Sequence, residues 1–249
     1  MASGRDRWHD RLMGPWQAAA ANNARWCDLI ARSHGLRTRS DSQAWTCQSR
    51  TPPFYPDAVT LVPRPAVADL LARIDVSPGC SVKDSFGVLD LGPRGFRILF
   101  EADWIARPAA SPPVAPRPGH PAWRRIVRPA GLARWQEAWQ PGGGPPGLFR
   151  ASILDHNQVA VLAAQRGDHI VAGAIVCASP AVAGISNFFA HPGAGAEPWP
   201  GCLALASSLF PCRTLAGYES GDELIQAERY GFERIGRLRV WIHDTSPPS

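Results

Sequence analysis

The apolar and polar positions of the second half of the chain alternate in a way that predicts three consecutive antiparallel strands. Apolar runs cover 159–165, 169–179 and 182–190. They are separated by Arg166-Gly167-Asp168 and by Pro180, residues that favour tight turns. We therefore expect a three-stranded meander in this part of the chain.

Helices and further strands are predicted on both sides of this meander. Before it, 123–127 is predicted as a strand, and 132–139 as a helix with Leu132, Trp135 and Trp139 on one face. After it come a helix over 202–210, a strand over 214–219, a helix that Ser220 or Asp222 can cap, and a last strand over 237–242.

The first half of the chain shows a similar order. Its pattern predicts a strand at 57–62, a helix at 66–74, a strand at 80–84, a helical segment at 85–91 and a strand at 94–105. The segments 82–105 and 218–242 both have an Asp before the predicted helix, a Gly-Phe pair after it and a Trp-Ile end. We interpret this as a divergent internal repeat; a chance similarity is the alternative.

Prolines concentrate between the two halves. The stretch RPAASPPVAPRPGHP (107–121) can form neither a helix nor a central strand and reads as an exposed connector. It predicts a division into 1–106 and 122–245.

Composition narrows the class of protein. No apolar run approaches the roughly 18 residues of a membrane span, and MASGRDRWHD lacks the apolar core of a signal peptide, so we expect a cytoplasmic protein without membrane contact. The formal charge is +5, but the arginines are spread along the chain, and we expect no nucleic acid partner. No C-x-x-C pair or histidine spacing indicates a metal.

The ending LAGYESGDELIQAERYGFERIGRLRVWI (215–242) is a strand, a helix and a strand hinged at Gly231-Phe232. With the order of elements before it, this stretch resembles the GNAT superfamily of acyl-CoA-dependent N-acyltransferases. The resemblance implies an α/β fold with a mixed, mostly antiparallel sheet flanked by helices, in two GNAT-like units of which 1–106 is truncated.

The resemblance also implies how a cofactor is held. In the family the fourth and fifth strands, here 184–190 and 214–219, splay apart, and free backbone groups of the fourth bind the pantetheine arm like an added strand. A glycine-containing loop, here within 191–201, binds the pyrophosphate through backbone N–H groups. The implied cofactor-binding residues are Asn187, Phe188, Phe189, Ala190, Gly193 and Gly195.

The sequence departs from the family pattern at two places. The loop lacks the leading Arg or Gln and contains Glu197 and three prolines, which have no N–H to donate. The family's frequent general acid, a Tyr four residues before the Gly-Phe pair, is replaced by Ala227.

The candidate catalytic residues are Glu219 and Tyr218, at the end of the predicted fifth strand. Glu219 could accept a proton from an amine; a capping or surface role is the alternative. The stretch 44–61, with Trp45 and Phe54, could line a pocket between the halves or simply pack there.

Two functions follow from these observations. The first is an N-acyltransferase that uses acetyl-CoA or another acyl-CoA as co-substrate and acts on a small-molecule amine, with its oligomeric state open. The alternative is a GNAT-like binding or scaffold protein without catalysis. A first half that binds a small molecule and regulates the second is a third possibility.

Overall fold

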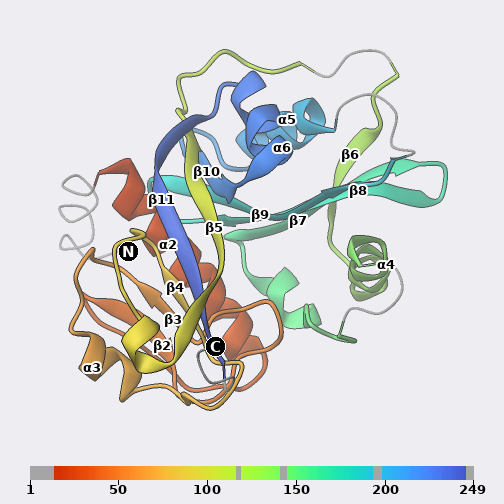
Figure 1. Cartoon of the computed structure of the whole chain (residues 1–249). Helices are drawn as coiled ribbons and strands as arrows, with labels where there is room; N and C mark the ends of the chain where they lie inside the picture. The colour runs from red at the N-terminus through yellow and green to blue at the C-terminus, as the bar shows by residue number, and fades with distance from the viewer. Residues whose placement is uncertain (1–13, 116–118, 141–144, 193–197, 245–249) are drawn as a thin grey trace. The chain divides into compact units, whose positions relative to one another are not determined.

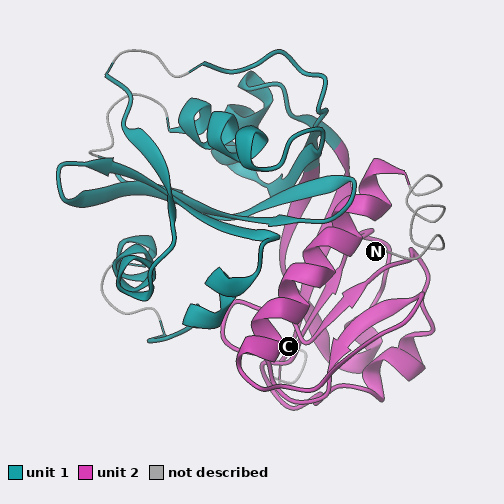
Figure 2. Cartoon of the chain, turned by 180° about the vertical axis from the view of Figure 1, so that it is seen from behind, with its two compact units in different colours: residues 1–12, 105–234 teal, residues 13–104, 235–249 magenta. Residues whose placement is uncertain are grey.

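The computed structural model describes residues 14–115, 119–140, 145–192 and 198–244, which form two compact units (Figure 1, Figure 2). Unit 1 contains residues 105–234 and unit 2 contains residues 13–104 and 235–249, each as far as it is described. The chain passes from one unit to the other within β5 (Phe96–Arg107) and within β11 (Glu233–His243).

Unit 1 contains the predicted meander. Its sheet has the order β10-β9-β8-β7-β6, in which every pair is antiparallel except β9 and β10. Its elements are β6 (Ala122–Ile126), α4 (Pro129–Trp139), the 3-10 turn η2 (Ala151–Asp155), β7 (Val159–Arg166), β8 (His169–Ala178), β9 (Val182–Ala190), α5 (Trp199–Leu209), β10 (Thr214–Glu219) and α6 (Gly221–Arg229). The mixed, mostly antiparallel α/β fold predicted from the sequence is confirmed.

Helices cover both faces of this sheet. On one face lie α5 and α6, and on the other lie α4 and η2 (Figure 1). The core under α5 combines Leu162, Val176 and Ile185 of the sheet with Cys202 and Leu203 of the helix. Removing these apolar side chains from water is the main stabilising term of the unit.

The hinge after α6 is a Schellman C-cap. Phe232 N–H donates to the Ala227 carbonyl and Gly231 N–H to that of Glu228, which satisfies two carbonyl groups at the helix end. Gly231 has φ 81°, a left-handed conformation that glycine adopts without a steric penalty. Ser220, one of the two residues predicted to cap α6, is its N-cap residue, but its side chain makes no capping hydrogen bond, so the predicted side-chain cap is wrong.

Unit 2 has the strand order β1-β2-β3-β4-β11-β5. Its elements are α2 (Pro15–Ser33), β1 (Thr38–Ser40), β2 (Ala44–Cys47), β3 (Ala58–Thr60), α3 (Val67–Leu71), β4 (Ser81–Asp84), the 3-10 turn η1 (Gly92–Arg94), and the unit 2 parts of β5 and β11. The pairs β3–β4 and β4–β11 are parallel and antiparallel respectively.

The last strand belongs to a different unit from the one that the sequence suggested. From Ile235 onward β11 lies in unit 2, where Trp241 is paired with Val82 of β4. The structure therefore divides the chain differently from the predicted boundary at 107–121. The proline stretch is a local signal, whereas the partner of a strand is set by long-range pairing that no local pattern encodes.

The prediction of a helical segment at 85–91 is wrong. The Asp84 carboxylate accepts hydrogen bonds from the N–H groups of Phe86 and Leu89 and so fixes a turn in place of a first helical turn. The repeat between 82–105 and 218–242 therefore does not extend to the helix. In addition, α3 is shorter than the predicted 66–74, and β1 and β2 were not predicted.

Candidate functional site

The strands β9 and β10 separate part-way along their length. They pair in parallel at Thr214–Val182, Leu215–Ala183 and Ala216–Gly184, and the ladder between the described residues ends there. Both strands continue, β9 to Ala190 and β10 to Glu219. The segments beyond the last pair, 185–190 of β9 and 217–219 of β10, make up the candidate site.

A bulge in β9 lies at the point of separation. Between the pairs Gly173–Phe189 and Ile175–Ser186, β9 contains one residue more than β8. Asn187 has φ 51°, in the left-handed region that Asn tolerates better than most residues. A bulge bends its strand and increases the local twist, which accounts for β9 turning away from β10 here.

The bulge also changes which face each later side chain of β9 occupies. Without it, strict alternation would place Asn187 on the face of Ile185. With it, Phe188 joins the α5 core cluster and stacks on Trp199 at a centroid distance of 4.2 Å. Phe189 packs on the opposite face against Trp135 of α4, at 5.4 Å. The predicted cofactor-binding residues Phe188 and Phe189 thus anchor β9 to helices on both faces.

Glu219 ends β10 on the far side of the separation. Its side chain is partly buried. Burial raises the pKa of the Glu219 carboxyl to about 7, and the nearby Glu223 carboxylate of α6 adds to the effect. A carboxyl group with a pKa close to neutral is suited to accept and release a proton under physiological conditions.

Tyr218 precedes Glu219 and is also half-buried. Because successive side chains of a strand point to opposite faces, Tyr218 and Glu219 do not face the same side of β10. The structure brings both residues to the end of β10, beside β9.

Ala227 is fully buried in the α5–α6 core, so the position of the family's frequent tyrosine acid offers no polar group. Tyr230, three residues later, is the C-cap of α6 and packs against the same core. Its backbone carbonyl accepts a 2.8 Å hydrogen bond from Arg107 Nε. These contacts give Tyr230 and Arg107 a role in fixing the end of α6.

The predicted phosphate loop is only partly described. Gly193 and Gly195 lie outside the described residues. Ala190 is exposed at the end of β9, and α5 begins at Trp199 with Pro198 as its N-cap residue. Pro200, in the first turn, has no N–H to donate.

Gly217 was missed by the sequence analysis. A Cβ atom at this position would lie 3.1 Å from the Ile185 carbonyl oxygen, closer than most side-chain contacts. A lone glycine inside a strand pattern is a signal of close backbone approach, and this signal could have identified the position.

In the stretch 44–61, several residues have internal contacts. Trp45 is buried and its indole N–H donates to Asp28, while Arg50 pairs with the buried Asp57 at 3.0 Å. Phe54 is 63% exposed. A pocket between the halves of the chain remains a prediction.

Other kinds of site find little support in the described part of the chain. It contains no cluster of three or more His, Cys, Asp or Glu residues able to hold a metal ion. No described helix has the length and hydrophobicity to span a membrane. Burial raises the pKa of the Cys202 thiol to about 12, so this cysteine is protonated and unreactive at neutral pH.

The chain resembles known proteins in its fold and not in its sequence. No protein-family model and no curated protein sequence matches the chain. A GCN5-related N-acetyltransferase from Kribbella flavida aligns with a TM-score of 0.64 and 14% identity, over 94% of this chain and 97% of its own. A putative GNAT acetyltransferase from Novosphingobium aromaticivorans aligns with a TM-score of 0.56 and 16% identity, over 88% and 96%.

A more distant match is the Saccharomyces cerevisiae N-myristoyltransferase with bound myristoyl-CoA and inhibitors. Its TM-score is 0.51 and its identity 7%, over 71% of this chain and 55% of that one. These identities are low, so the similarity concerns the three-dimensional fold. Together with the separation of β9 and β10, the alignments show that the chain has the fold of the GCN5-related N-acetyltransferases.

Proposed function

We propose that the protein is an acyl-CoA-dependent N-acyltransferase that transfers an acyl group, acetyl in the simplest case, to a small-molecule amine. The observation that supports this most directly is the separation of β9 from β10 after the Ala216–Gly184 pair, with the bulge at Asn187. It leaves a length of β9 beside β10 where an extended ligand can add as a strand.

The pantetheine arm of a CoA thioester has the shape and the amide groups for such strand-like binding. The residues that would hold it are those of β9 after the bulge, Phe188, Phe189 and Ala190, with Asn187 setting their direction. The stacking of Phe188 on Trp199 keeps this length of backbone fixed to α5. When bound, acyl-CoA would supply the acyl group as an activated thioester.

Glu219 is the proposed general base. An amine is protonated at neutral pH and must lose a proton to act as a nucleophile. The raised pKa of the Glu219 carboxyl, about 7, lets its carboxylate take that proton directly or through a water. Tyr218, the other candidate at the end of β10, is proposed to contact substrate from the opposite face of the strand.

A binding or scaffold protein without catalysis is the second candidate, and one observation favours it. Ala227 places a buried methyl group where the resemblance implies a tyrosine acid. If the protein is an acyltransferase, no described residue of α6 replaces the tyrosine as general acid. The rate of acyl transfer then depends on the positioning of the two substrates and on Glu219 as the base.

The test combines binding and turnover. Acetyl-CoA and free CoA are titrated into the full chain by calorimetry, and a panel of amines is then screened for acylated product by mass spectrometry. We expect micromolar binding and a turnover that Glu219→Gln lowers while acetyl-CoA binding is kept. The control is Glu137→Gln, which removes an equal charge at an exposed position on α4.

Absence of binding up to millimolar acetyl-CoA would exclude the acyltransferase. Binding without turnover on any amine would favour the scaffold candidate. Equal turnover by Glu219→Gln and wild type would remove Glu219 as the base.

A further inference from the structure

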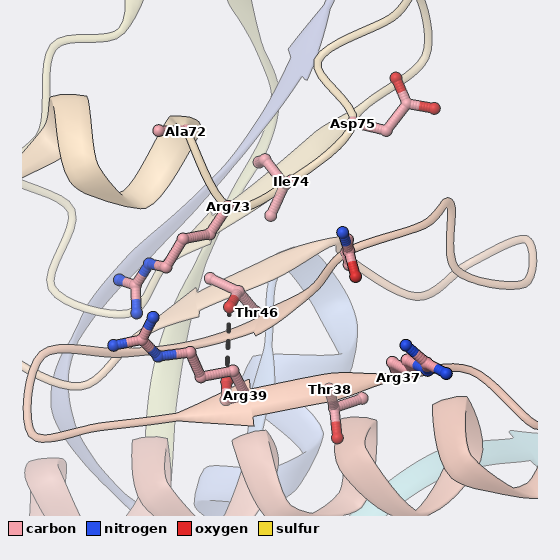
Figure 3. A pocket seen from close by; sticks show the side chains of 9 residues that line it. Arg37, Thr38, Arg39, Thr46, Ala72, Arg73, Ile74 and Asp75 are labelled. Atoms are coloured by element: carbon pink, nitrogen blue, oxygen red, sulfur yellow. Dashed lines mark hydrogen bonds between the residues drawn. The ribbon is translucent and has the colours of Figure 1, made fainter.

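Unit 2 contains a pocket of about 510 Å³ that runs along the β1–β2 hairpin, between the hairpin and the segment 72–75 (Figure 3). Its lining includes three arginines, Arg37, Arg39 and Arg73, together with Thr46 and Ile74. All of the residues that line it belong to unit 2. Its volume lies in the range of small-molecule sites.

The pairing of β1 with β2 explains why charge gathers on this face. Arg39 is directly opposite Thr46, so the two side chains share one face of the hairpin. Ala44, two residues before Thr46, belongs to the core under α3, which identifies this as the α3 face. Thr46 is buried, and its hydroxyl donates to the Arg39 carbonyl at 3.4 Å, the dashed line in Figure 3.

Arg73, which follows α3, is held in place on the side of the pocket opposite β1. Its Nη1 donates to Asp41 Oδ2 at 2.6 Å and its Nε to the Asp69 carbonyl at 3.1 Å. Its side chain is only 17% exposed. A guanidinium group has five N–H donors, so donors of Arg73 remain for a ligand after these two bonds.

The charges of the pocket are unbalanced. Arg37 and Arg39 form no ion pair with any residue of the described ranges. Figure 3 shows the side chains of Arg39 and Arg73 extending toward the same end of the pocket. The one acidic residue in the lining, Asp75, uses its carboxylate to accept a hydrogen bond from Ser77 N–H at 2.9 Å. Asp41 pairs with Arg73, so Arg37 and Arg39 are the lining arginines whose charge no ion pair in the described ranges balances, and their charge favours an anion in the pocket.

We propose that this pocket is a binding site for a small molecule that carries an oxyanion, a phosphate or a carboxylate, held by Arg39 and Arg73. Guanidinium groups bind both oxyanions through paired, charge-assisted hydrogen bonds. Asp41 positions Arg73 through its hydrogen bond. Arg37, the residue before β1, adds positive charge, and Ile74 offers the ligand an apolar surface. The site is separate from β9 and β10 and does not depend on the proposed acyltransferase activity.

The experiment follows the arginine Nε–Hε signals of the full chain in two-dimensional ¹H–¹⁵N spectra. Inorganic phosphate and succinate are titrated separately at constant ionic strength. Arg39→Gln and Arg73→Gln assign the two pocket signals and test their role. The matched control is Arg94→Gln, which removes the same charge from the exposed η1 turn.

We expect the signals of Arg39 and Arg73 to shift and saturate with one of the two anions, which identifies the group as phosphate or carboxylate. In Arg39→Gln the midpoint should rise at least about tenfold, as expected for the loss of a charge-assisted hydrogen bond. Arg94→Gln and Glu219→Gln should leave the midpoint unchanged, which separates this site from the candidate active site.

Shifts that never saturate, or that are as large for Arg94 as for Arg39, would mean nonspecific attraction to positive charge and would overturn the proposal. An unchanged midpoint in Arg39→Gln would do the same. Arg39 is exposed, so this variant should retain the fold even if Arg73→Gln, which leaves Asp41 without its partner, is less stable.

Discussion

Gly217 of β10 lies so close to Ile185 of β9 that a Cβ atom on the glycine would be 3.1 Å from the Ile185 carbonyl oxygen. This contact comes one residue after the last ladder pair of the two strands, Ala216–Gly184. The two backbones are therefore in contact at the closed end of the candidate site. They can approach this closely because Gly217 has no side chain.

Enlarging Gly217 should push the strands apart at this end. We expect Gly217→Ala to have a small effect and Gly217→Val to lower the free energy of unfolding by about 1–3 kcal/mol, as overpacking does. Acetyl-CoA affinity should fall in the same order. Urea unfolding and calorimetry measure the two effects; a valine variant that binds acetyl-CoA as well as wild type would contradict this account of the closed end.

Glu219→Gln should lower the activity of the protein while raising its stability at alkaline pH. Its carboxyl has a pKa raised from 4.5 to about 7 in the folded protein, so the fold favours the protonated form. The folded state therefore binds more protons than the unfolded state between these values, and stability is lost as the pH rises toward 7.

Replacing Glu219 by glutamine removes this loss. We expect the variant to have a higher Tm than wild type at pH 8 and a similar Tm at pH 4, because glutamine resembles the protonated carboxyl. Turnover should fall by about 10²–10⁴-fold, the range for loss of a general base. A variant that is less stable than wild type at pH 8 would show that the Glu219 carboxylate is well stabilised in the fold.

Wild-type turnover should itself depend on pH through the same group. The value of kcat/KM is expected to rise with pH up to about 7 and then level off, because the carboxylate is the active form. This limb should be absent in Glu219→Gln and present in Glu137→Gln. A limb that persists unchanged in Glu219→Gln would assign it to another group.

Replacing Asn187 by glycine should leave the stability of the protein nearly unchanged, whereas replacing it by valine should lower it. Its φ of 51° is strained for a β-branched residue and accessible to glycine. We expect Asn187→Val to destabilise the protein by about 1–2 kcal/mol, and to weaken acetyl-CoA binding because Phe188 would leave its place on Trp199. Tryptophan fluorescence and chemical unfolding report the change, and Asn187→Gly is the control. If Asn187→Val had the stability and the tryptophan fluorescence of wild type, β9 would not need the bulge.

Asp57 should be needed for the fold of unit 2. Its carboxylate, 2% exposed, accepts hydrogen bonds from Arg50, from Thr51 N–H and Oγ1–H, and from Ser81 N–H. Asp57→Ala removes all these acceptors at once and should lower the free energy of unfolding by about 3–5 kcal/mol. The exposed Asp168→Ala is the control, and urea unfolding of both variants gives the measurement. A loss below 1 kcal/mol would contradict a structural role.

Most helices and strands of unit 1 could be predicted from the sequence, because each depends on residues only a few positions apart. The sequence predicts the meander β7–β8–β9 from alternation and turns and α6 from its amphipathic pattern, whereas the C-cap at Gly231 is seen only in the structure. The same reasoning failed at 85–91, where the Asp84 carboxylate bonds forward to Phe86 and Leu89. An Asp before an apolar stretch can start a helix or close a turn, and only the bonds it makes distinguish the two.

The roles of the candidate site residues stay predictions, while the structure shows where the described ones lie. The sequence places Glu219 at the end of a predicted strand, and the family resemblance implies a role for Phe188 and Phe189. The raised pKa of Glu219 depends on burial and on Glu223 four residues later, and the assignment of Phe188 and Phe189 to opposite faces depends on a bulge. Neither is encoded in a two-residue alternation.

The sequence by itself determined the succession of strands and helices in unit 1, since hydrophobic periodicity and capping residues act over a few positions. The tertiary structure alone decided which strands pair. It placed β11 beside β4, made β9 diverge from β10 after three pairs, and gathered Arg39 and Arg73 in one pocket. These outcomes depend on contacts between residues far apart in the chain, whose pairing is selected by the packing of the whole fold.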